Sequence, residues 1–467
     1  MKLNMPTVGP ILGYTSHSEN RVWFRGKFES TDELSYKRCF GLMRYKEPDS
    51  ATWSKPLFNK MSANFDMSCV LAIQNLKADT LYEYQVGWLF VDAELDKINS
   101  IDADLFEWPN SSFLFKTASK TKSKARSYVV GSCRYLLKTF GFEIFDDRGD
   151  KIFKSILNMH ENNKIDGMVM MGDQIYADDL SFVKPDVKLS EFLLRYRTVF
   201  SQEKIRELMA IVPTYMILDD HEIEDNWPTK AANKDYITLY PRAIHAYQIY
   251  QASHSPLFKA DADGRIDGVL QKFWYQFTDG CSEWFILDCR TERNTTNDIR
   301  NIISHEQMSA LLSWLDDESG KVKMIVTSVP FCPDFESDNN DKWGAFPLER
   351  GIILDKITDL KNVKVVFVSG DVHCSYLAEI KEENSQKPIA HQVVSSSFFW
   401  PYPHMKEGEI IQGKYLKAEG QKKYSAKLIS KVISDDNFVK IDIHPKGIGA
   451  TFYSRKGEQL ETKNVIF

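Results

Sequence analysis

The sequence predicts an α/β domain preceded by an all-β sandwich, and three observations support this prediction. From Val8 to about Lys116, short apolar runs are separated by turn residues and show no helical period. Residues 117–126 are rich in Lys, Ser and Thr, as expected of a polar connection. From Arg126 onward, apolar strands alternate with helical segments. We therefore expect a β-sandwich over residues 1–118, a linker over 119–126 and an α/β domain over 127–467.

The strands of the first domain are expected at apolar or alternating segments that turn residues interrupt. Such spacing is typical of an antiparallel sandwich of about 100 residues. One connection, Leu76–Tyr82, resembles the corner before a late strand of fibronectin-type or immunoglobulin-like domains, where a Tyr hydroxyl bonds back to the chain. The expected strands are Arg21–Gly26, Ser68–Ile73, Thr80–Gly87 and Phe113–Phe115.

The second domain should contain helices between its strands. Ser304 and Gln307 have the spacing of a capping box at the start of one helix. The region from Trp343 to Leu360 is expected to be a loop that runs into a further helix, and the tail from Lys440 to contain alternating strands. The other helices are expected at Ile144–Glu161, Leu189–Met209, Pro241–Ser253 and Ser304–Asp317.

Composition excludes several classes of protein. The formal charge of -6, without a long basic run, argues against a nucleic-acid backbone binder, although a small phosphate ester remains possible as a substrate. No stretch approaches the roughly 20 apolar residues of a membrane span. Because no signal peptide is visible, we expect a cytoplasmic protein, or a periplasmic or secreted one if a signal was trimmed. The seven scattered cysteines predict neither a disulfide framework nor a structural zinc site.

The most informative segment is Met168–Tyr176. Four apolar residues predict a buried strand that stops at Gly172, and the oxygen donors Asp173 and Tyr176 follow. A phenol binds only an ion that can remove its proton, so this pair suggests a hard, highly charged cation such as ferric iron. The alternative is an ordinary strand end whose Asp caps a helix and whose Tyr packs inward.

Three other apolar strands also end in polar or metal-binding residues. Because ligands gather at the carboxyl ends of strands in α/β folds, we expect a site on one sheet edge. Each element has a simpler explanation: a core cysteine, a helix-capping Asp, a structural His. Taken together, the four strand ends favour metal-dependent hydrolysis. The other three ends carry Cys133 with Arg134, the run Asp219–Glu222, and Asp371 with His373.

These motifs, in this order, resemble the PhoD-like alkaline phosphatases and phosphodiesterases, relatives of the purple acid phosphatases within the calcineurin-like metallophosphatases. The resemblance implies a sheet sandwich flanked by helices over 127–467, with the amino-terminal sandwich in front. The matching segments are Val8–Gly13, Val22–Gly26, Gly131–Cys133, Gly172–Asp178, Asp219–Glu222, Leu287–Arg290, Trp343–Arg350, Ser369–Ser375 and Ser395–Ser397.

The resemblance also implies a metal centre with two kinds of ion. Cys133, Asp173, Tyr176 and His373 would hold ferric iron, and Asp173 would bridge to a second ion. Calcium is expected there, with manganese, zinc or magnesium as alternatives.

The second site is less complete than the first. Asp220 and Asp371 would face it, but the strand Val322–Val329 brings no histidine to it, unlike the related phosphatases. Asp219, Asp225, Asn226 or Asp288 could fill that place, and the sequence does not choose among them.

Two further residues are expected to act on the substrate. His221 would protonate the leaving group or steady the phosphoryl oxygens, unless it only bonds a neighbouring carboxylate. Arg134 would neutralise phosphoryl charge, unless it is a surface residue paired with an acid. The aromatic residues Trp343, Phe398, Phe399, Trp400 and Tyr402 could stack on a substrate or belong to the core.

The function expected from the sequence is metal-dependent hydrolysis of a small phosphate ester, monoester or diester. Two alternatives remain open: a non-catalytic ligand-binding protein that keeps this fold, and a redox enzyme that uses the iron. The sequence predicts neither nucleic-acid binding nor a membrane span, and leaves the oligomeric state open.

Overall fold

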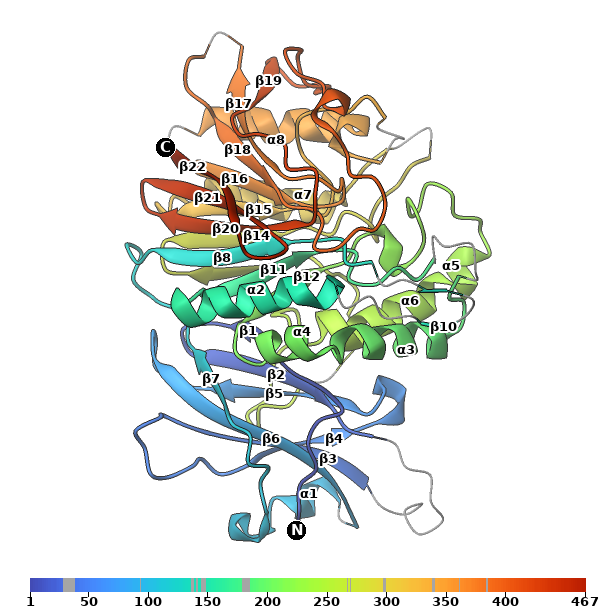
Figure 1. Cartoon of the computed structure of the whole chain (residues 1–467), viewed down its shortest axis with the longest axis vertical. Coiled ribbons are helices and arrows are strands. Elements are labelled where there is room, and N and C mark those ends of the chain that lie inside the picture. The colour runs from blue at the N-terminus through green and yellow to red at the C-terminus, as the bar shows by residue number, and fades with distance from the viewer. Residues whose placement is uncertain are drawn as a thin grey trace.

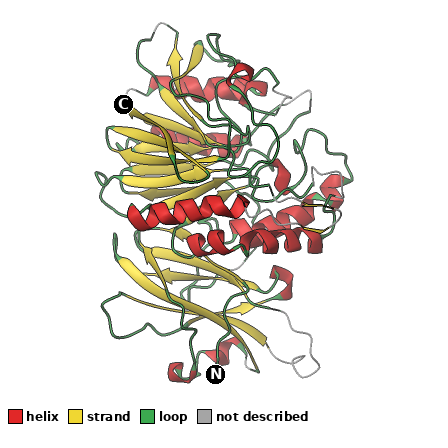
Figure 2. Ribbon diagram, in the orientation of Figure 1, coloured by secondary structure: helices red, strands yellow, loops and turns green. Residues whose placement is uncertain are grey.

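The computed structural model describes the whole chain except residues 28–37, 93, 136–137, 140–141, 144–147, 179–184, 267, 269, 297–299, 338–340, 361 and 384. Figure 1 and Figure 2 show two small sheets near the N-terminus, stacked below a larger layered body of sheets and helices. No helix in the described part of the chain is long and apolar enough to span a bilayer.

The amino-terminal part consists of two antiparallel sheets. A three-stranded sheet has the order β1-β2-β5, and a four-stranded sheet has the order β4-β3-β6-β7. The Tyr82 hydroxyl accepts the backbone N–H of Lys77 at 3.0 Å, which confirms the predicted tyrosine corner. The strands are β1 Val8–Thr15, β2 Glu19–Arg25, β3 Arg38–Lys46, β4 Leu57–Met61, β5 Ser68–Gln74, β6 Leu81–Val91 and β7 Phe113–Lys116, with the short helix α1 at Leu95–Ile98.

The larger body is built on a six-stranded sheet and a seven-stranded sheet. The first has the order β12-β11-β8-β20-β21-β22, and the second β13-β14-β15-β16-β18-β17-β19. The six strands of the first are β8 Arg126–Gly131, β11 Gly167–Met171, β12 Thr214–Ile217, β20 Asn437–His444, β21 Gly447–Ser454 and β22 Gln459–Ile466. The seven of the second are β13 Tyr275–Asp279, β14 Ser282–Ile286, β15 Val322–Val326, β16 Lys364–Ser369, β17 Tyr376–Glu382, β18 Ala390–Val394 and β19 Tyr424–Leu428. A short hairpin, β9 Lys138–Thr139 with β10 Phe142–Glu143, lies outside both sheets.

Alternating side chains place one hydrophobic core between the two sheets and one on each outer face. Along β11, Val169 and Met171 join the core between the sheets, whereas Met168 and Met170 pack with the helices of the other face. Val366 of β16 likewise faces the inner core, and Phe367 faces the outer core with α7 and α8. The predicted sheet sandwich flanked by helices is therefore present, with two sheets where the strand-end pattern alone suggested one.

Helices cover the outer faces of both sheets. The predicted helix Leu189–Met209 is two helices, because the Asp150 carboxylate accepts the backbone N–H groups of Lys204 and Ile205 and so starts a second helix. The first four residues of the predicted helix Ile144–Glu161 lie outside the described residues. The helices are α2 Arg148–Asn162, α3 Leu189–Phe200, α4 Glu203–Met209, α5 Asp235–Thr238, α6 Tyr240–Tyr247 with a π-helical extension at Gln248–Ala252, α7 His305–Asp316 and α8 Pro347–Asp359.

The predicted capping box at the start of α7 is half formed. The Ser304 hydroxyl accepts the Gln307 backbone N–H at 3.2 Å, as expected. The Gln307 side-chain amide, however, accepts the Asp288 backbone N–H with its oxygen and donates to the Asp288 carbonyl with its nitrogen.

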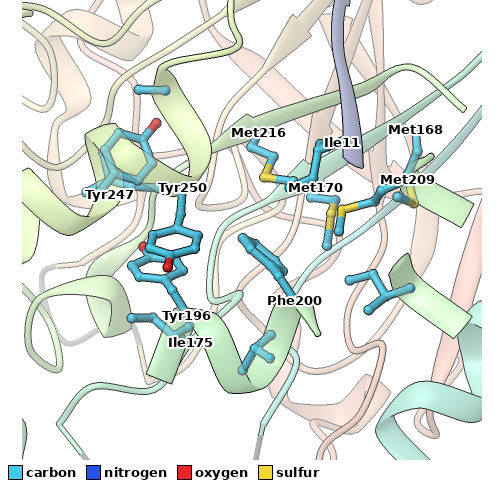
Figure 3. Close-up of a cluster of buried hydrophobic side chains, with 14 of the residues drawn as sticks. Ile11, Met168, Met170, Ile175, Tyr196, Phe200, Met209, Met216, Tyr247 and Tyr250 are labelled. Atoms are coloured by element: carbon cyan, nitrogen blue, oxygen red, sulfur yellow. The ribbon is translucent and has the colours of Figure 1, made fainter. Parts of the chain in front are cut away.

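The amino-terminal sheet is joined to the larger body by a shared core. Ile11 of β1 belongs to the same buried cluster as Met170 of β11 and Met216 of β12, and Figure 3 shows these side chains close together. Tyr250 of the π-helical extension is stacked on Tyr196 of α3 in this cluster, with ring centroids 5.0 Å apart. The first sheet therefore contributes to the packing beneath the strands that support the site.

Candidate active site

The four predicted strand ends meet at one rim of the two packed sheets. β8, β11 and β12 are parallel neighbours in the six-stranded sheet. β16 belongs to the seven-stranded sheet, where it pairs with β15 and β18. The prediction of a single sheet edge was therefore wrong, because two sheets packed face to face bring their strand ends together.

Backbone contacts hold these strand ends against one another. The Cys133 N–H donates to the Gly172 carbonyl at 3.2 Å, and the Arg134 N–H donates to the Asp173 carbonyl at 2.8 Å. The Asp371 N–H donates to Ser132 Oγ at 3.3 Å. Gly370 allows this approach, because a Cβ there would lie 2.1 Å from Ser132 Oγ.

The backbone at the candidate ligands is strained. Cys133, Asp173, Asp371 and His373 have φ values of 56°, 56°, 71° and 50°, in the left-handed region that non-glycine residues rarely adopt. Such conformations cost on the order of 1–3 kcal/mol each and cluster at functional sites. Their concentration at one rim indicates that the positions of these side chains matter more than local stability.

A first group of donors surrounds the Asp173 carboxylate. Asp173 Oδ2 lies 3.4 Å from Cys133 Sγ and 3.4 Å from the Tyr176 hydroxyl. Asp173 Oδ1 and His373 Nε2 are buried, and the described part of the chain offers neither a hydrogen-bond partner. Buried polar atoms are rarely left unsatisfied, so these two atoms point to a ligand.

The electrostatics of this group also favour a cation. Burial raises the pKa of the Cys133 thiol, the Asp173 carboxyl and the Tyr176 phenol well above their ordinary values. Burial lowers the pKa of His373, which keeps its imidazole neutral. A multivalent cation would reverse the first effect, because it stabilises the anionic form of each donor.

A second group consists mainly of carboxylates. Ligand atoms of Asp173, Asp220 and His221 lie within 4.8 Å of one another, and the same holds for Asp219, Asp220 and Asp371. Both groups of side chains could hold a metal ion. Asp220 belongs to both, so the two positions are adjacent.

His221 is held by a carboxylate that the sequence analysis did not single out. Its Nδ1–H donates to the Asp178 carboxylate at 2.8 Å, and its ring centroid lies 4.4 Å from that of Tyr176. Burial alone would lower the pKa of His221, but the carboxylates of Asp178, Asp220 and Asp173 raise it well above its ordinary value. The imidazolium form is therefore favoured at neutral pH.

The remaining predicted residues lie at different distances from this centre. The Asn226 N–H donates to Asp220 Oδ2 at 2.6 Å, so Asn226 borders the carboxylate group. Asp225 accepts Lys230 Nζ at 2.6 Å. Asp288 accepts the backbone N–H groups of Arg290 and Thr291, and the structure does not bring it into either group.

Arg134 turns away from the carboxylates. Its guanidinium donates to the Gly149 and Val199 carbonyls and lies 3.6 Å from Asp150, over the ring of Phe153. These contacts agree with the alternative in which Arg134 pairs with an acid, here Asp150. The Arg134 side chain is, however, buried and not on the surface.

Glu222 also belongs to the site, although the sequence indicated it only as the last residue of the run Asp219–Glu222. Its carboxylate accepts the backbone N–H groups of Asp173, Gln174 and Asp219 at 3.0, 2.7 and 2.8 Å. Glu222 therefore ties the ends of β11 and β12 together. The signal that could have found it is its place at the end of the Asp219–Glu222 run.

Arg290 and Lys342 were missed as well. Arg290 contacts Asp219, and its Nη2 lies 3.4 Å from Asp220 Oδ1. Lys342 Nζ lies 2.9 Å from Asp371 Oδ2. Arg290 lies in the matching segment Leu287–Arg290 but was given no role, and Lys342 immediately precedes the matching segment Trp343–Arg350.

The aromatic residues near the site divide into core and rim. Trp343, Phe398 and Phe399 are buried. The ring of Trp400 is stacked on His373 with centroids 3.7 Å apart, and Tyr402, which is 39% exposed, lies against Trp400. Trp400 and Tyr402 are thus the members of this set that border the candidate metal ligands and solvent.

Comparison with known proteins identifies the family. The family model described as PhoD-like phosphatase matches residues 140–452, more than half of the chain. The chain belongs to the PhoD-like phosphatase family. The resemblance drawn from the sequence motifs is confirmed.

Two relatives extend the comparison. Alkaline phosphatase D from Bacillus subtilis (strain 168) is 23% identical over 237 residues, a segment that spans 45% of this chain and 40% of that relative. A solved structure described as the structure of PhoD superposes with a TM-score of 0.71 at 15% identity, covering 99% of this chain and 92% of that one. The second comparison confirms the predicted fold class over nearly the full length.

Proposed function

We propose that this protein hydrolyses small phosphate esters at a metal ion held by Cys133, Asp173, Tyr176 and His373. The observation that carries the proposal is the convergence of a thiol, a carboxylate and a phenol from two strand ends, together with the buried, partnerless imidazole of His373 at a third. Three of these four residues have a strained backbone. Family membership supports phosphate-ester chemistry in particular.

The donors fit a ferric ion well. Thiolate and phenolate are strong anionic ligands, and the partnerless atoms Asp173 Oδ1 and His373 Nε2 would complete the set. When bound, such an ion supplies Lewis-acid activation of the attacking water and of the phosphoryl group. Cysteine and tyrosine together are a poor match for magnesium or calcium, which prefer oxygen ligands without a thiol.

His221 is assigned to the leaving group. Asp178 holds Nδ1, so Nε2 is the ring nitrogen that can serve a substrate. A bond forms between the water oxygen and phosphorus, and the phosphorus–oxygen bond to the leaving group breaks. The proton on His221 Nε2 then passes to the departing alkoxide, and the water proton is released to solvent or to the vacated imidazole.

Other side chains keep the site in shape. Glu222 fixes the loop that carries Asp173, and Ser132 and Ser396 each place a hydroxyl 3.2 Å from Cys133 Sγ. Arg134 is left out of the catalytic set, because the described contacts of its side chain are with α2 and α3. Asp219, Asp220 and Asp371 would face a second cation, expected from the resemblance to be calcium, with manganese, zinc or magnesium as alternatives. No step of this mechanism depends on that ion. Cationic side chains of the chain itself already contact these carboxylates.

The experiment is hydrolysis of p-nitrophenyl phosphate and of bis-p-nitrophenyl phosphate by the wild type and Asp173→Ala. We expect turnover of at least one ester by the wild type and a loss of about 1,000-fold or more in the variant. The ratio of the two rates gives the preference for monoester or diester. Asp359→Ala, at the exposed end of α8, is the matched control and should keep full activity.

Two results would contradict the proposal. Full activity of Asp173→Ala would remove Asp173 from the site. A wild type that holds metal and turns over neither ester would favour the non-catalytic ligand-binding protein.

A further inference from the structure

We propose that the Lys342 ammonium takes the place of the second metal ion in this centre. The inference rests on the proposed function, because it concerns the position beside the proposed iron site. It departs from the iron and calcium pair that the family resemblance implies. The centre would then work with one metal ion and one fixed ammonium group.

The ammonium lies among the carboxylates that would hold that ion. Lys342 Nζ is 2.9 Å from Asp371 Oδ2 and 3.7 Å from Asp341 Oδ2. Asp371 in turn has a carboxylate oxygen within 4.8 Å of those of Asp219 and Asp220. A divalent ion bound to Asp371 would therefore compete with Lys342 for the same carboxylate.

Cationic side chains also lie beside the neighbouring carboxylates, although Asp219 Oδ2 and Asp220 Oδ1 are buried without a hydrogen-bond partner among the described residues. Arg290 contacts Asp219 and Asp341 and places Nη2 3.4 Å from Asp220 Oδ1. Arg293 Nη1 lies 2.7 Å from Asp341 Oδ1. The connected cluster thus contains four carboxylates and three cations: Asp219, Asp220, Asp341 and Asp371 with Arg290, Arg293 and Lys342.

This charge balance disfavours a divalent ion. Three fixed positive charges already neutralise most of the cluster, and they would repel an added cation over a few ångströms. Near the proposed iron ligands the charged neighbour is instead His221, which has a ring nitrogen within 4.8 Å of an Asp173 oxygen. Among the described residues, no Lys or Arg forms an ion pair with Asp173.

The fold determines where the ammonium lies. Lys342 immediately precedes Trp343, a fully buried residue whose Nε1–H donates to Thr327 Oγ1 at 2.9 Å. Thr327 directly follows β15, the strand that brings no histidine to the site. The Lys342 side chain is only 13% exposed, so it is an internal group rather than a mobile surface lysine.

An ammonium can serve part of the role of a second cation. It carries one positive charge and up to three donors, and it can steady phosphoryl oxygens without leaving the protein. It cannot supply a second Lewis-acid centre. The resulting enzyme should need no calcium in the medium.

The test is equilibrium dialysis against calcium at about 0.1 mM, a concentration at which moderately tight sites fill. Bound calcium and iron are then counted per chain by elemental analysis in the wild type, Lys342→Gln and Lys342→Arg. Lys440→Gln removes a lysine charge from a different ion pair and serves as the control.

We expect the wild type, Lys342→Arg and Lys440→Gln to retain no calcium. Lys342→Gln should bind one calcium ion per chain, with affinity higher by on the order of 100-fold, because a close positive charge is removed. Removing calcium with EGTA should leave the hydrolysis rate of the wild type unchanged.

A wild type that retains one calcium ion per chain would overturn the inference, whether or not Lys342→Gln folds. A folded Lys342→Gln that gains no calcium would also overturn it. Either result can occur while phosphate esters are still hydrolysed, in which case the proposed function stands. Absence of hydrolysis in a wild type that contains iron and no calcium would instead overturn the proposed function.

Discussion

The carboxylate of Glu222 accepts the backbone N–H of Asp173 at 3.0 Å and thereby fixes the strained residue at the centre of the site. The same carboxylate accepts the N–H groups of Gln174 and Asp219, so one side chain joins the ends of two strands. A neutral amide cannot accept all these bonds, because its nitrogen is a donor.

Glu222→Gln should therefore loosen the metal site. We expect metal affinity to fall by about 10–100-fold, the usual effect of removing a group that supports metal ligands. Isothermal titration with the metal measures this change. Glu207→Gln, on the exposed face of α4, is the control and should bind metal like the wild type. Unchanged affinity in Glu222→Gln would show that Asp173 does not depend on this support.

Asp66 links the amino-terminal sheets to the larger body in addition to their shared core. Its carboxylate accepts Arg25 Nε at 3.0 Å and Arg197 Nη1 at 2.8 Å, and it also accepts the Tyr250 hydroxyl. Asp66 itself is 8% exposed. Removing one partner of such a buried network leaves charges uncompensated.

Asp66→Ala should lower the free energy of unfolding by about 3 kcal/mol, measured by urea denaturation. Asp359→Ala, which breaks an exposed pair with Lys422, should cost no more than about 1 kcal/mol. Equal losses in the two variants would mean that the Asp66 network contributes no more than a surface pair.

The stability of the protein should fall in acid partly because of His254. Burial lowers the pKa of His254 from 6.5 to about 4 in the folded state. The unfolded chain therefore binds more protons between these values, so stability is complete above pH 6.5 and is lost as the pH falls towards 4.

The expected loss is roughly 3 kcal/mol across this interval, from about 1.4 kcal/mol for each unit of pKa difference. His254→Gln should have a flatter stability curve between pH 6.5 and 4 in urea denaturation. A curve as steep as that of the wild type would assign the acid sensitivity to other groups.

The positions of the candidate metal ligands at the strand ends could be predicted from the sequence better than their surroundings. Strand ends could be located because apolar runs stop abruptly at Gly131, Gly172 and Asp219, and each is followed by a polar residue. The fold class followed from the change of pattern near Arg126. Neither result required knowledge of long-range contacts.

The parts that sequence did not predict all depend on contacts between distant segments. Nothing local indicates that Lys342 reaches Asp371 or that Arg290 reaches Asp219, because each pair is formed by separate loops. The same holds for Arg134, whose direction is set by carbonyls of Gly149 and Val199. The division of the strands between two sheets likewise depends on pairing partners.

The central claim is that a metal ion is bound by Cys133 and Tyr176, and the visible absorption spectrum with iron content tests it most directly. Ferric iron bound to thiolate and phenolate should give the wild type a visible charge-transfer band with about one iron per chain. Cys133→Ser should lose part of this band and bind iron more weakly. Cys281→Ser, whose thiol contacts the Ile443 carbonyl away from the site, should match the wild type. A Cys133→Ser variant with unchanged colour and unchanged iron would contradict the claim.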